Sequence, residues 1–362
     1  MRIADILDIK ASRRTGKAEI PAEEVALREV GDVVTGDRLA PEVGEGEPDH
    51  GLRLARRWAP EVERYYDLFL KRAEDLRERV QAKRNISPSP ILSDLYRLIN
   101  DDLIEEFYSY AMMAHQDKDD LVTHGIDVLG TCLVVGVGLK LDIKMLLKLG
   151  LAAVLENVGM YRVPERILHK REKLSEEEIS SIQDHPRESY EILVGLGEKY
   201  RWLADTALGV HERMDGSGYP NGLSGEKISP LSFIIGLADM YTAMIRERPH
   251  RKRFRKSEAI KYIVGETKGL FPLGIRKVFL DRVSLFPVGT YVRLNSGTVG
   301  CVIATNRKHA IRPTIQVIHN AAGQVVEEEE ILNLGDNPLL YIAEEVDQDG
   351  FPKMRFQKRT VA

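Results

Sequence analysis

The chain has 362 residues, of which 43% are hydrophobic and 30% are charged, and its formal net charge is −4. This length and hydrophobic content allow two or three domains with buried cores. The small negative charge excludes the strongly basic character of many nucleic-acid-binding proteins. Two cysteines without a CxxC spacing exclude a disulfide framework and fit a reducing compartment.

Residues 1–50 are rich in Gly, Pro and Glu, a composition that predicts a flexible or poorly structured segment. Charges are spread through its first ten residues, so it lacks the apolar core of a signal peptide. The most apolar run, Leu129–Leu139, is too short to span a bilayer. We therefore expect a cytoplasmic protein without membrane insertion.

Residues 51–89 are predicted to be a helical region or linker. Hydrophobic side chains recur every three or four positions from Leu52 to Arg84, which is the pattern of an amphipathic helix. Two interpretations fit it. The helix either packs on its own domain, or it pairs with a second copy as a dimerising or signal-transmitting helix, which would make the protein a homodimer. Two prolines at positions 88 and 90 mark the boundary that follows.

Residues 90–285 are predicted to form one helical domain. Ser175 and Glu178 have the spacing of a capping box at the start of one helix. Glycine and proline fall between the periodic segments and not inside them. The predicted helices are Leu92–Met113, Leu121–Leu139, Ile143–Glu156, Ser175–Asp184, Arg187–Leu196, Trp202–His211, Pro230–Ile245 and Ser257–Lys268.

Residues 286–362 have a strand-like pattern, and the change of period lies near Val288. Three β-branched segments are separated by turn-forming residues: Thr290–Leu294, Val299–Ala304 and Thr314–Ile318. They predict a small antiparallel β-domain of about five strands. The fold class is therefore mainly α, with a small C-terminal β-domain.

The segment His211-Glu-Arg-Met-Asp-Gly-Ser-Gly-Tyr-Pro220 concentrates polar chemistry before a glycine-rich turn. Because Asp-Gly favours a turn, we expect His211 and Glu212 on the last turn of a helix. Gly216–Pro220 has no apolar period, which predicts an exposed loop that serves as a contact surface. A single histidine of this kind is more often a packed or capping side chain than a ligand.

Other side chains that can bind metals occur in the neighbouring predicted helices. Asp120 and His124 lie four residues apart, so they share one helix face. Glu156 ends a helix, and His185 lies at a helix break. Asp239 lies in the middle of an apolar helix, where an acid is costly unless it is paired or metal-bound. Such ligands from several helices are the donor set of a metal site inside a helical bundle.

His211–Pro220 resembles the HHExxDGxGYP signature of the HD-GYP family, which consists of helical, metal-dependent phosphodiesterases of cyclic di-GMP. Val163–Leu168, Lys173–Glu178, Ala238–Ala243 and Arg248–Arg251 resemble further elements of that family in the same order. The resemblance covers residues 90 to 285. It implies an HD-type helical bundle and iron or manganese as the metal.

The resemblance also implies the site residues. The metal ligands would be His124, His185, His211 and Asp239, with Asp120 as an additional carboxylate that some members carry. The GYP loop would consist of Asp215, Gly216, Gly218, Tyr219 and Pro220.

The sequence departs from the family at the HD pair itself. Glu156-Asn157 stands where the family has His-Asp, and Val210 replaces the first histidine of the HH pair. The family aspartate bridges two metals, which together stabilise the attacking and leaving oxygens. Neutral Asn157 is a poor bridge, although Glu156 can still bind one cation. We therefore expect at most one metal, weak or absent catalysis, and no confidently assigned catalytic residue.

The segment Arg246–Lys256 contains seven Lys or Arg residues. Arg248 and Arg251 match family positions near the substrate phosphates, so the resemblance implies phosphate contacts there. A solvated basic helix end is the alternative interpretation. Nucleic-acid binding is not expected, because one aromatic residue, Phe254, does not make the repeated aromatic interleaving of a nucleic-acid-binding module.

Three functional hypotheses follow. The first is a signalling protein with a degenerate HD-GYP domain that acts by binding cyclic di-GMP, a diguanylate cyclase or another signalling protein at the GYP loop. The second is an active metal-dependent phosphodiesterase in which Glu156 and Asp120 form a rearranged metal site. The third is a structural scaffold that binds no nucleotide.

Overall fold

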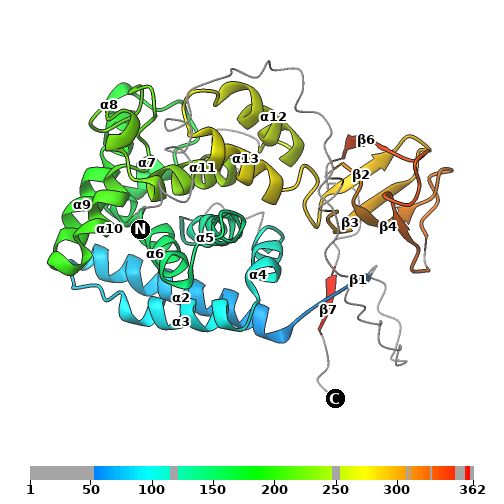
Figure 1. The fold of residues 1–362 in the computed structure, drawn as a ribbon, viewed down its shortest axis with the longest axis horizontal. Coiled ribbons are helices and arrows are strands. Elements are labelled where there is room, and N and C mark those ends of the chain that lie inside the picture. The colour runs from blue at the N-terminus through cyan, green and yellow to red at the C-terminus, as the bar shows by residue number, and fades with distance from the viewer. Residues whose placement is uncertain are drawn as a thin grey trace, which may run out of the picture. The chain divides into compact units, whose positions relative to one another are not determined.

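The structure is a computed structural model that describes residues 53–114, 121–246, 253–306, 309, 311–326, 328–346 and 355–358 (Figure 1). Four of the sequence predictions fall on other residues: the flexible segment 1–50, the carboxylate Asp120, and the phosphate-binding candidates Arg248 and Arg251. These lie outside the described residues.

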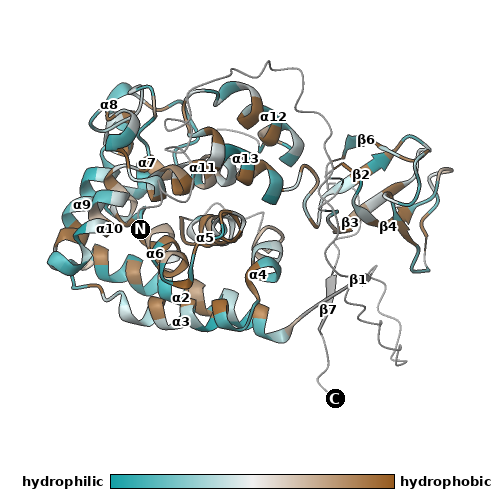
Figure 2. Ribbon diagram, in the orientation of Figure 1, coloured by the Kyte–Doolittle hydropathy of each residue, from teal (hydrophilic) through white to brown (hydrophobic). Residues whose placement is uncertain are grey.

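The helix predicted from Leu52 starts later than expected. A short strand, β1 (Arg53–Trp58), comes first and pairs in parallel with β7 (Arg355–Lys358). The helix α2 (Pro60–Gln81) then begins at a proline, whose fixed φ suits the first helical turn and whose missing N–H is not needed there. The buried face of α2 packs against α3, α4 and α5, as the first interpretation of this helix proposed. The opposite face is polar (Figure 2).

The helical region contains more and shorter elements than predicted. Asp102 has a φ of 55° and divides the helix predicted over Leu92–Met113 into two, because that left-handed conformation cannot continue a helix. The capping box at Ser175 and Glu178 is confirmed. The elements are α3 (Ser89–Asn100), α4 (Ile104–Ala111), α5 (Leu121–Gly138), α6 (Ile143–Leu155), η2 (Val158–Arg162), α7 (Glu165–Leu168), α8 (Glu176–Gln183), α9 (His185–Val194), η3 (Glu198–Tyr200), α10 (Arg201–Leu208), η4 (Gly225–Lys227), α11 (Pro230–Ile245), α12 (Lys256–Glu266) and α13 (Leu273–Arg282).

The apolar helix α5 lies at the centre of the helical region, with α2, α4, α6, α11 and α13 packed around it (Figure 1). Among the described residues it alone has the length and hydropathy of a membrane span, and 78% of it is buried inside the structure. Its position accounts for that composition, because a helix enclosed by other helices is hydrophobic on all sides. The helix α13 was not predicted, and it buries Ile275 and Phe279.

The C-terminal part forms the predicted antiparallel sheet of five strands, in the order β5-β4-β3-β2-β6. The strands are β2 (Tyr291–Leu294), β3 (Val299–Ala304), β4 (Thr314–His319), β5 (Ile331–Asn333) and β6 (Ile342–Glu345). Its core contains Val292, Val302 and Ile315, all with no exposed surface. Glu345 at the end of β6 accepts hydrogen bonds from the backbone N–H groups of Lys256 and Ser257, so the sheet caps the start of α12.

Candidate metal centre

Glu156 follows the last residue of α6, as the sequence predicted, and is 1% exposed. Its backbone is fixed to α9 by Ser189, whose hydroxyl donates to the Glu156 carbonyl oxygen at 2.7 Å and accepts from the Gly159 N–H at 2.9 Å. Only glycine fits at position 159, since a Cβ there would lie 2.2 Å from the backbone oxygen of His185. This close approach of η2 to α9 places Glu156 beside His185.

His185 is the first residue of α9, at the predicted helix break. Its Nδ1 lies 2.7 Å from the Ile182 carbonyl oxygen. A ring nitrogen beside a carbonyl must donate, so in the neutral ring Nε2 is left with its lone pair. Burial lowers the pKa of His185, which favours this neutral state. His185 therefore presents Nε2 as a ligand atom.

His211 lies three residues beyond the end of α10, so the prediction that it and Glu212 occupy the last turn of a helix is wrong. Gly209 is the residue after the helix, and glycine readily ends helices. The His211 Nε2 atom lies 3.1 Å from Nε2 of His185, and its ring stacks on Tyr219 at 4.8 Å between centroids. Burial is the main cause that lowers the pKa of His211 to about 3. The imidazole is thus neutral at physiological pH.

The GYP loop is held by Glu212, a role that the sequence analysis did not identify. Glu212 has no exposed surface, and its carboxylate accepts from the N–H groups of Asn221 at 2.7 Å and Leu223 at 2.8 Å. Tyr219 is half-buried against His211, and Ser217 is the one exposed residue of the Gly216–Pro220 segment. The predicted exposed loop is thus exposed at Ser217 and half-buried elsewhere, because it folds back over the histidine, and its use as a contact surface stays a prediction.

His124 on α5 and Asp239 on α11 are in direct contact, with 2.8 Å between Nε2 and Oδ1. Both side chains are mostly buried. The contact provides the partner that an acid in the middle of an apolar helix requires. The negative charge of Asp239 also contributes to the pKa values of Glu156, His185 and His211, and in each case it acts to raise the pKa.

A second buried ion pair joins the same two helices. Arg246, directly after α11, donates from Nε to the Asp127 carboxylate at 2.7 Å and from Nη1 to the Thr123 hydroxyl at 2.7 Å. Asp127 lies three residues after His124 on α5. The pair therefore fixes the register of α5 against α11, and with it the contact between His124 and Asp239.

Glu156, His185 and His211 form a cluster whose potential ligand atoms all lie within 4.8 Å of one another. Among the described residues no group donates a hydrogen bond to Glu156 Oε2, although this atom is buried. One carboxylate oxygen and two imidazole nitrogens are a donor set that suits zinc, iron or manganese. The side chains present therefore fit a metal ion.

The charge balance of this cluster also favours a cation. Burial, followed by the nearby Asp239 carboxylate, raises the pKa of Glu156 well above its usual value. A metal ion at Oε2 would reverse this effect, because an opposite charge nearby favours the ionised carboxylate. Binding of a metal should then release a proton.

The two positions that depart from the family pattern supply no further ligand. The Asn157 side chain donates its amide N–H to Glu156 Oε1, so it presents a donor and not a carboxylate to the cluster. Val210 is 1% exposed and packs as a hydrophobic core residue. The two ends of the basic segment 246–256 do not match a solvated basic helix end. Arg246 and Lys256 are both buried.

Comparison with known proteins identifies the family of the chain. Residues 108–271 match the HD domain family, and residues 291–353 match a KOW domain associated with HD domains. A cyclic di-GMP phosphodiesterase of Pseudomonas aeruginosa is 30% identical over 263 residues, which is 73% of this chain and 59% of the relative. One of Borreliella burgdorferi is 31% identical over 179 residues, 49% of this chain and 46% of the relative.

A 3'3'-cGAMP-specific phosphodiesterase of Vibrio cholerae is 34% identical over 162 residues, 43% of this chain and 37% of the relative. A solved structure, an HDG"Y"P protein from Bdellovibrio bacteriovorus, aligns with a TM-score of 0.44 and 18% identity, covering 61% of this chain and 70% of that one. The chain spans about half the length of the curated relatives that it matches. On the HD domain match and the identity to the curated cyclic di-GMP phosphodiesterases, the chain belongs to the HD-GYP family of HD-domain proteins.

Proposed function

We propose that this protein is a cytoplasmic signalling protein whose HD domain binds a cyclic dinucleotide together with one metal ion. The nucleotide expected first is cyclic di-GMP. The protein hydrolyses it slowly or not at all. The observation that carries the proposal is the composition of the buried cluster. Glu156, His185 and His211 supply three ligand atoms, but the adjacent Asn157 supplies an amide N–H.

The metal would be held by Glu156, His185 and His211, with Asp239 beside them. When bound, such a metal acts as a Lewis acid toward a phosphate oxygen. A phosphodiester cleavage also needs the developing charge on the leaving oxygen to be stabilised, which in two-metal sites is done by the second ion. Position 157 carries an amide in place of the family's bridging carboxylate, so the residue that holds two ions together in the family is missing here.

The ligand and the partner are inferred from the relatives and from the loop. Relatives that are 30–31% identical are named cyclic di-GMP phosphodiesterases, and a further one is named for 3'3'-cGAMP. The GYP loop lies directly over His211, with Tyr219 stacked on its ring. A nucleotide at the metal would therefore alter the surface of this loop, which a diguanylate cyclase or another signalling protein could then recognise.

Titration of the full chain with cyclic di-GMP and with 3'3'-cGAMP, in manganese and after chelation, tests this proposal. We expect saturable binding of one nucleotide that requires the metal. His211→Ala should abolish the binding, whereas His169→Ala, which removes an exposed histidine outside the cluster, should leave it unchanged. Equal nucleotide affinity in both variants, or no binding at all, would contradict the proposal.

Glu156 favours a second candidate function, an active phosphodiesterase with a rearranged metal site. A buried carboxylate replaces a histidine at this position and points its Oε2 into the cluster without a hydrogen-bond partner among the described residues. A carboxylate can bridge two ions where a histidine cannot. Multiple turnovers of cyclic di-GMP in iron or manganese, lost in Glu156→Gln, would favour this candidate over the first.

A further inference from the structure

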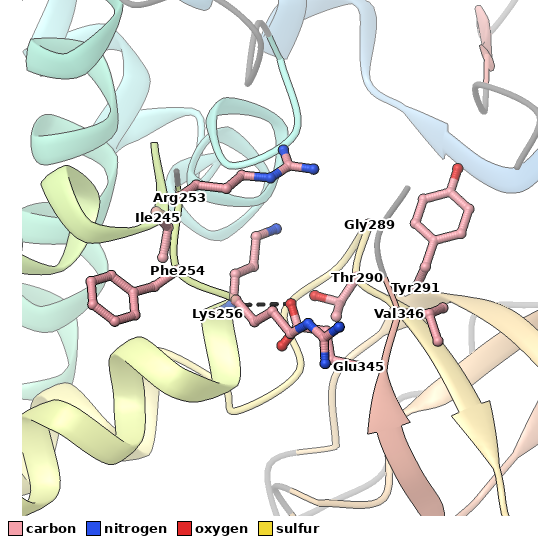
Figure 3. A pocket seen from close by; sticks show the side chains of 10 residues that line it. Ile245, Arg253, Phe254, Lys256, Gly289, Thr290, Tyr291, Glu345 and Val346 are labelled. Atoms are coloured by element: carbon pink, nitrogen blue, oxygen red, sulfur yellow. Dashed lines mark hydrogen bonds between the residues drawn. The ribbon is translucent and has the colours of Figure 1, made fainter. Parts of the chain in front are cut away.

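A small cavity lies where the start of α12 meets β2 and β6, and it shares no residue with the metal cluster. Its volume is about 50 Å³, which is somewhat more than the roughly 30 Å³ that one molecule occupies in liquid water. Cationic side chains dominate its polar lining, which contains a single carboxylate, Glu345, and three cations: Arg253, Arg255 and Lys256. Figure 3 shows Arg253 and Lys256 extending toward the same side of the cavity.

One carboxylate cannot balance three cations, and its oxygens already accept hydrogen bonds from other donors. Glu345 accepts from the Lys256 N–H at 3.0 Å, from the Ser257 N–H at 2.9 Å and from the Ser257 hydroxyl at 2.6 Å (Figure 3 draws the first of these bonds). The Lys256 ammonium itself donates one long bond, 3.4 Å, to the Met112 carbonyl oxygen. An ammonium has three donors, so the cavity holds donor capacity that the described residues do not use.

Two groups in the cavity indicate a missing anion. Thr290 is 3% exposed, and its hydroxyl has no hydrogen-bond partner among the described residues. Lys256 is 7% exposed, and burial lowers its pKa to about 8 in spite of the Glu345 charge, with Arg253 lowering it further. A buried hydroxyl without a partner and a buried ammonium are both costly unless a ligand completes their bonding.

We propose that this cavity is a binding site for an oxyanion of the phosphate type, held by Arg253, Lys256 and Thr290. A tetrahedral oxyanion presents several acceptor oxygens to guanidinium, ammonium and hydroxyl donors at once. The volume admits one such group, either as free phosphate or as the terminal phosphate of a phosphomonoester. Arg253 lies just before α12, Lys256 is its first residue and Thr290 precedes β2, so the bound anion stabilises the junction of the helical region with the sheet.

Isothermal titration of the full chain with inorganic phosphate, after chelation of metals, tests the site without interference from the metal cluster. We expect one phosphate per chain. Arg253→Gln and Thr290→Val should each weaken binding, the former by about tenfold or more, as loss of a charged hydrogen bond does. Lys261→Gln is the matched control, since it removes an exposed charge from the same helix outside the cavity.

Proton linkage provides a second readout that does not depend on substitutions. Lys256 is influenced by Glu345, Cys301, Arg253 and Asp127, and its pKa of about 8 leaves part of it neutral near pH 8. A bound anion favours the charged ammonium, so binding of sulfate, which does not titrate itself, should take up protons at pH 8 and almost none at pH 6. Lys256→Met should abolish this uptake.

Parallel titrations with phosphate and with glycerol phosphate distinguish the source of the anion. Tighter binding of the phosphomonoester assigns the site to the end of a larger ligand, and tighter binding of phosphate assigns it to the free ion. The proposal is overturned if neither anion nor sulfate binds the chelated chain, or if Arg253→Gln and Lys261→Gln bind phosphate equally well.

Discussion

Replacing Arg246 by methionine tests how strongly the buried ion pair holds α5 against α11. The Arg246 guanidinium contacts the Asp127 carboxylate at 2.6 and 2.7 Å, and the two side chains are only 7% and 6% exposed. Removing one partner of such a pair leaves an uncompensated buried charge, which costs about 3–5 kcal/mol. At about 2 °C per kcal/mol for a chain of this size, Tm should fall by roughly 6–10 °C.

The loss of stability in Arg246→Met should also depend on pH. Burial raises the pKa of the Asp127 carboxyl, and Arg246 opposes this effect. Without Arg246 the carboxyl should bind a proton at higher pH. A group with a raised folded-state pKa contributes stability that is complete below its unfolded pKa and is lost as pH rises through the folded pKa. The deficit of the variant should therefore be largest at alkaline pH and shrink toward acidic pH.

Scanning calorimetry at several pH values measures both effects. Arg293→Met is the control, because the pair between Arg293 and Glu344 is 43% and 51% exposed, and such surface pairs contribute about 1 kcal/mol or less. Adding Asp127→Asn to Arg246→Met should recover part of the loss, because the orphaned charge disappears. If Arg246→Met lowers Tm no more than Arg293→Met, or if its deficit is independent of pH, the argument for a register-setting ion pair is wrong.

Three further predictions concern the loop, the close approach of η2 to α9, and the buried lysine. Glu212→Ala should speed amide hydrogen exchange at the N–H groups of Asn221 and Leu223, which the Glu212 carboxylate binds. It should also lower the free energy of unfolding in urea by about 1–3 kcal/mol. Unchanged exchange at these two groups would show that the loop is ordered without Glu212. Gly159→Ala places a Cβ 2.2 Å from the His185 backbone oxygen, so metal content should drop sharply in a chain that keeps its helical circular dichroism. Burial lowers the pKa of Lys256 from 10.5 to about 8 in the folded state, which therefore binds fewer protons than the unfolded state between these pH values. The wild type should accordingly gain stability from pH 8 to 10.5 relative to Lys256→Met. Parallel curves of unfolding free energy against pH for the two proteins would refute this.

The sequence was most informative where the signal is local. The capping box at Ser175 depends on residues three positions apart, and the change to strand near Val288 depends on neighbouring side chains alternating in character. The close association of Glu156, His185 and His211 came from the resemblance, which carries information on tertiary structure that periodicity does not contain.

Features that depend on distant residues were not predicted. The partner of Asp127, Arg246, lies 119 residues away in the chain. Asp127 stands in an apolar helix, as Asp239 does, and this position indicates that a partner is needed but does not identify it. The break at Asp102 was missed because hydrophobic side chains continue the helical period across it. The function of Glu212 was missed because a carboxylate that binds backbone N–H groups leaves no spacing pattern in the sequence.

Metal stoichiometry tests the central claim most directly. The full chain, reconstituted with iron or manganese and desalted, should hold at most one metal ion by mass spectrometry, and it should turn over cyclic di-GMP slowly or not at all. The combined change Glu156→His, Asn157→Asp and Val210→His restores the family pattern and should raise the metal content toward two. Two tightly bound metal ions with sustained hydrolysis in the unmodified chain would contradict the account and establish Glu156 as part of a working two-metal site.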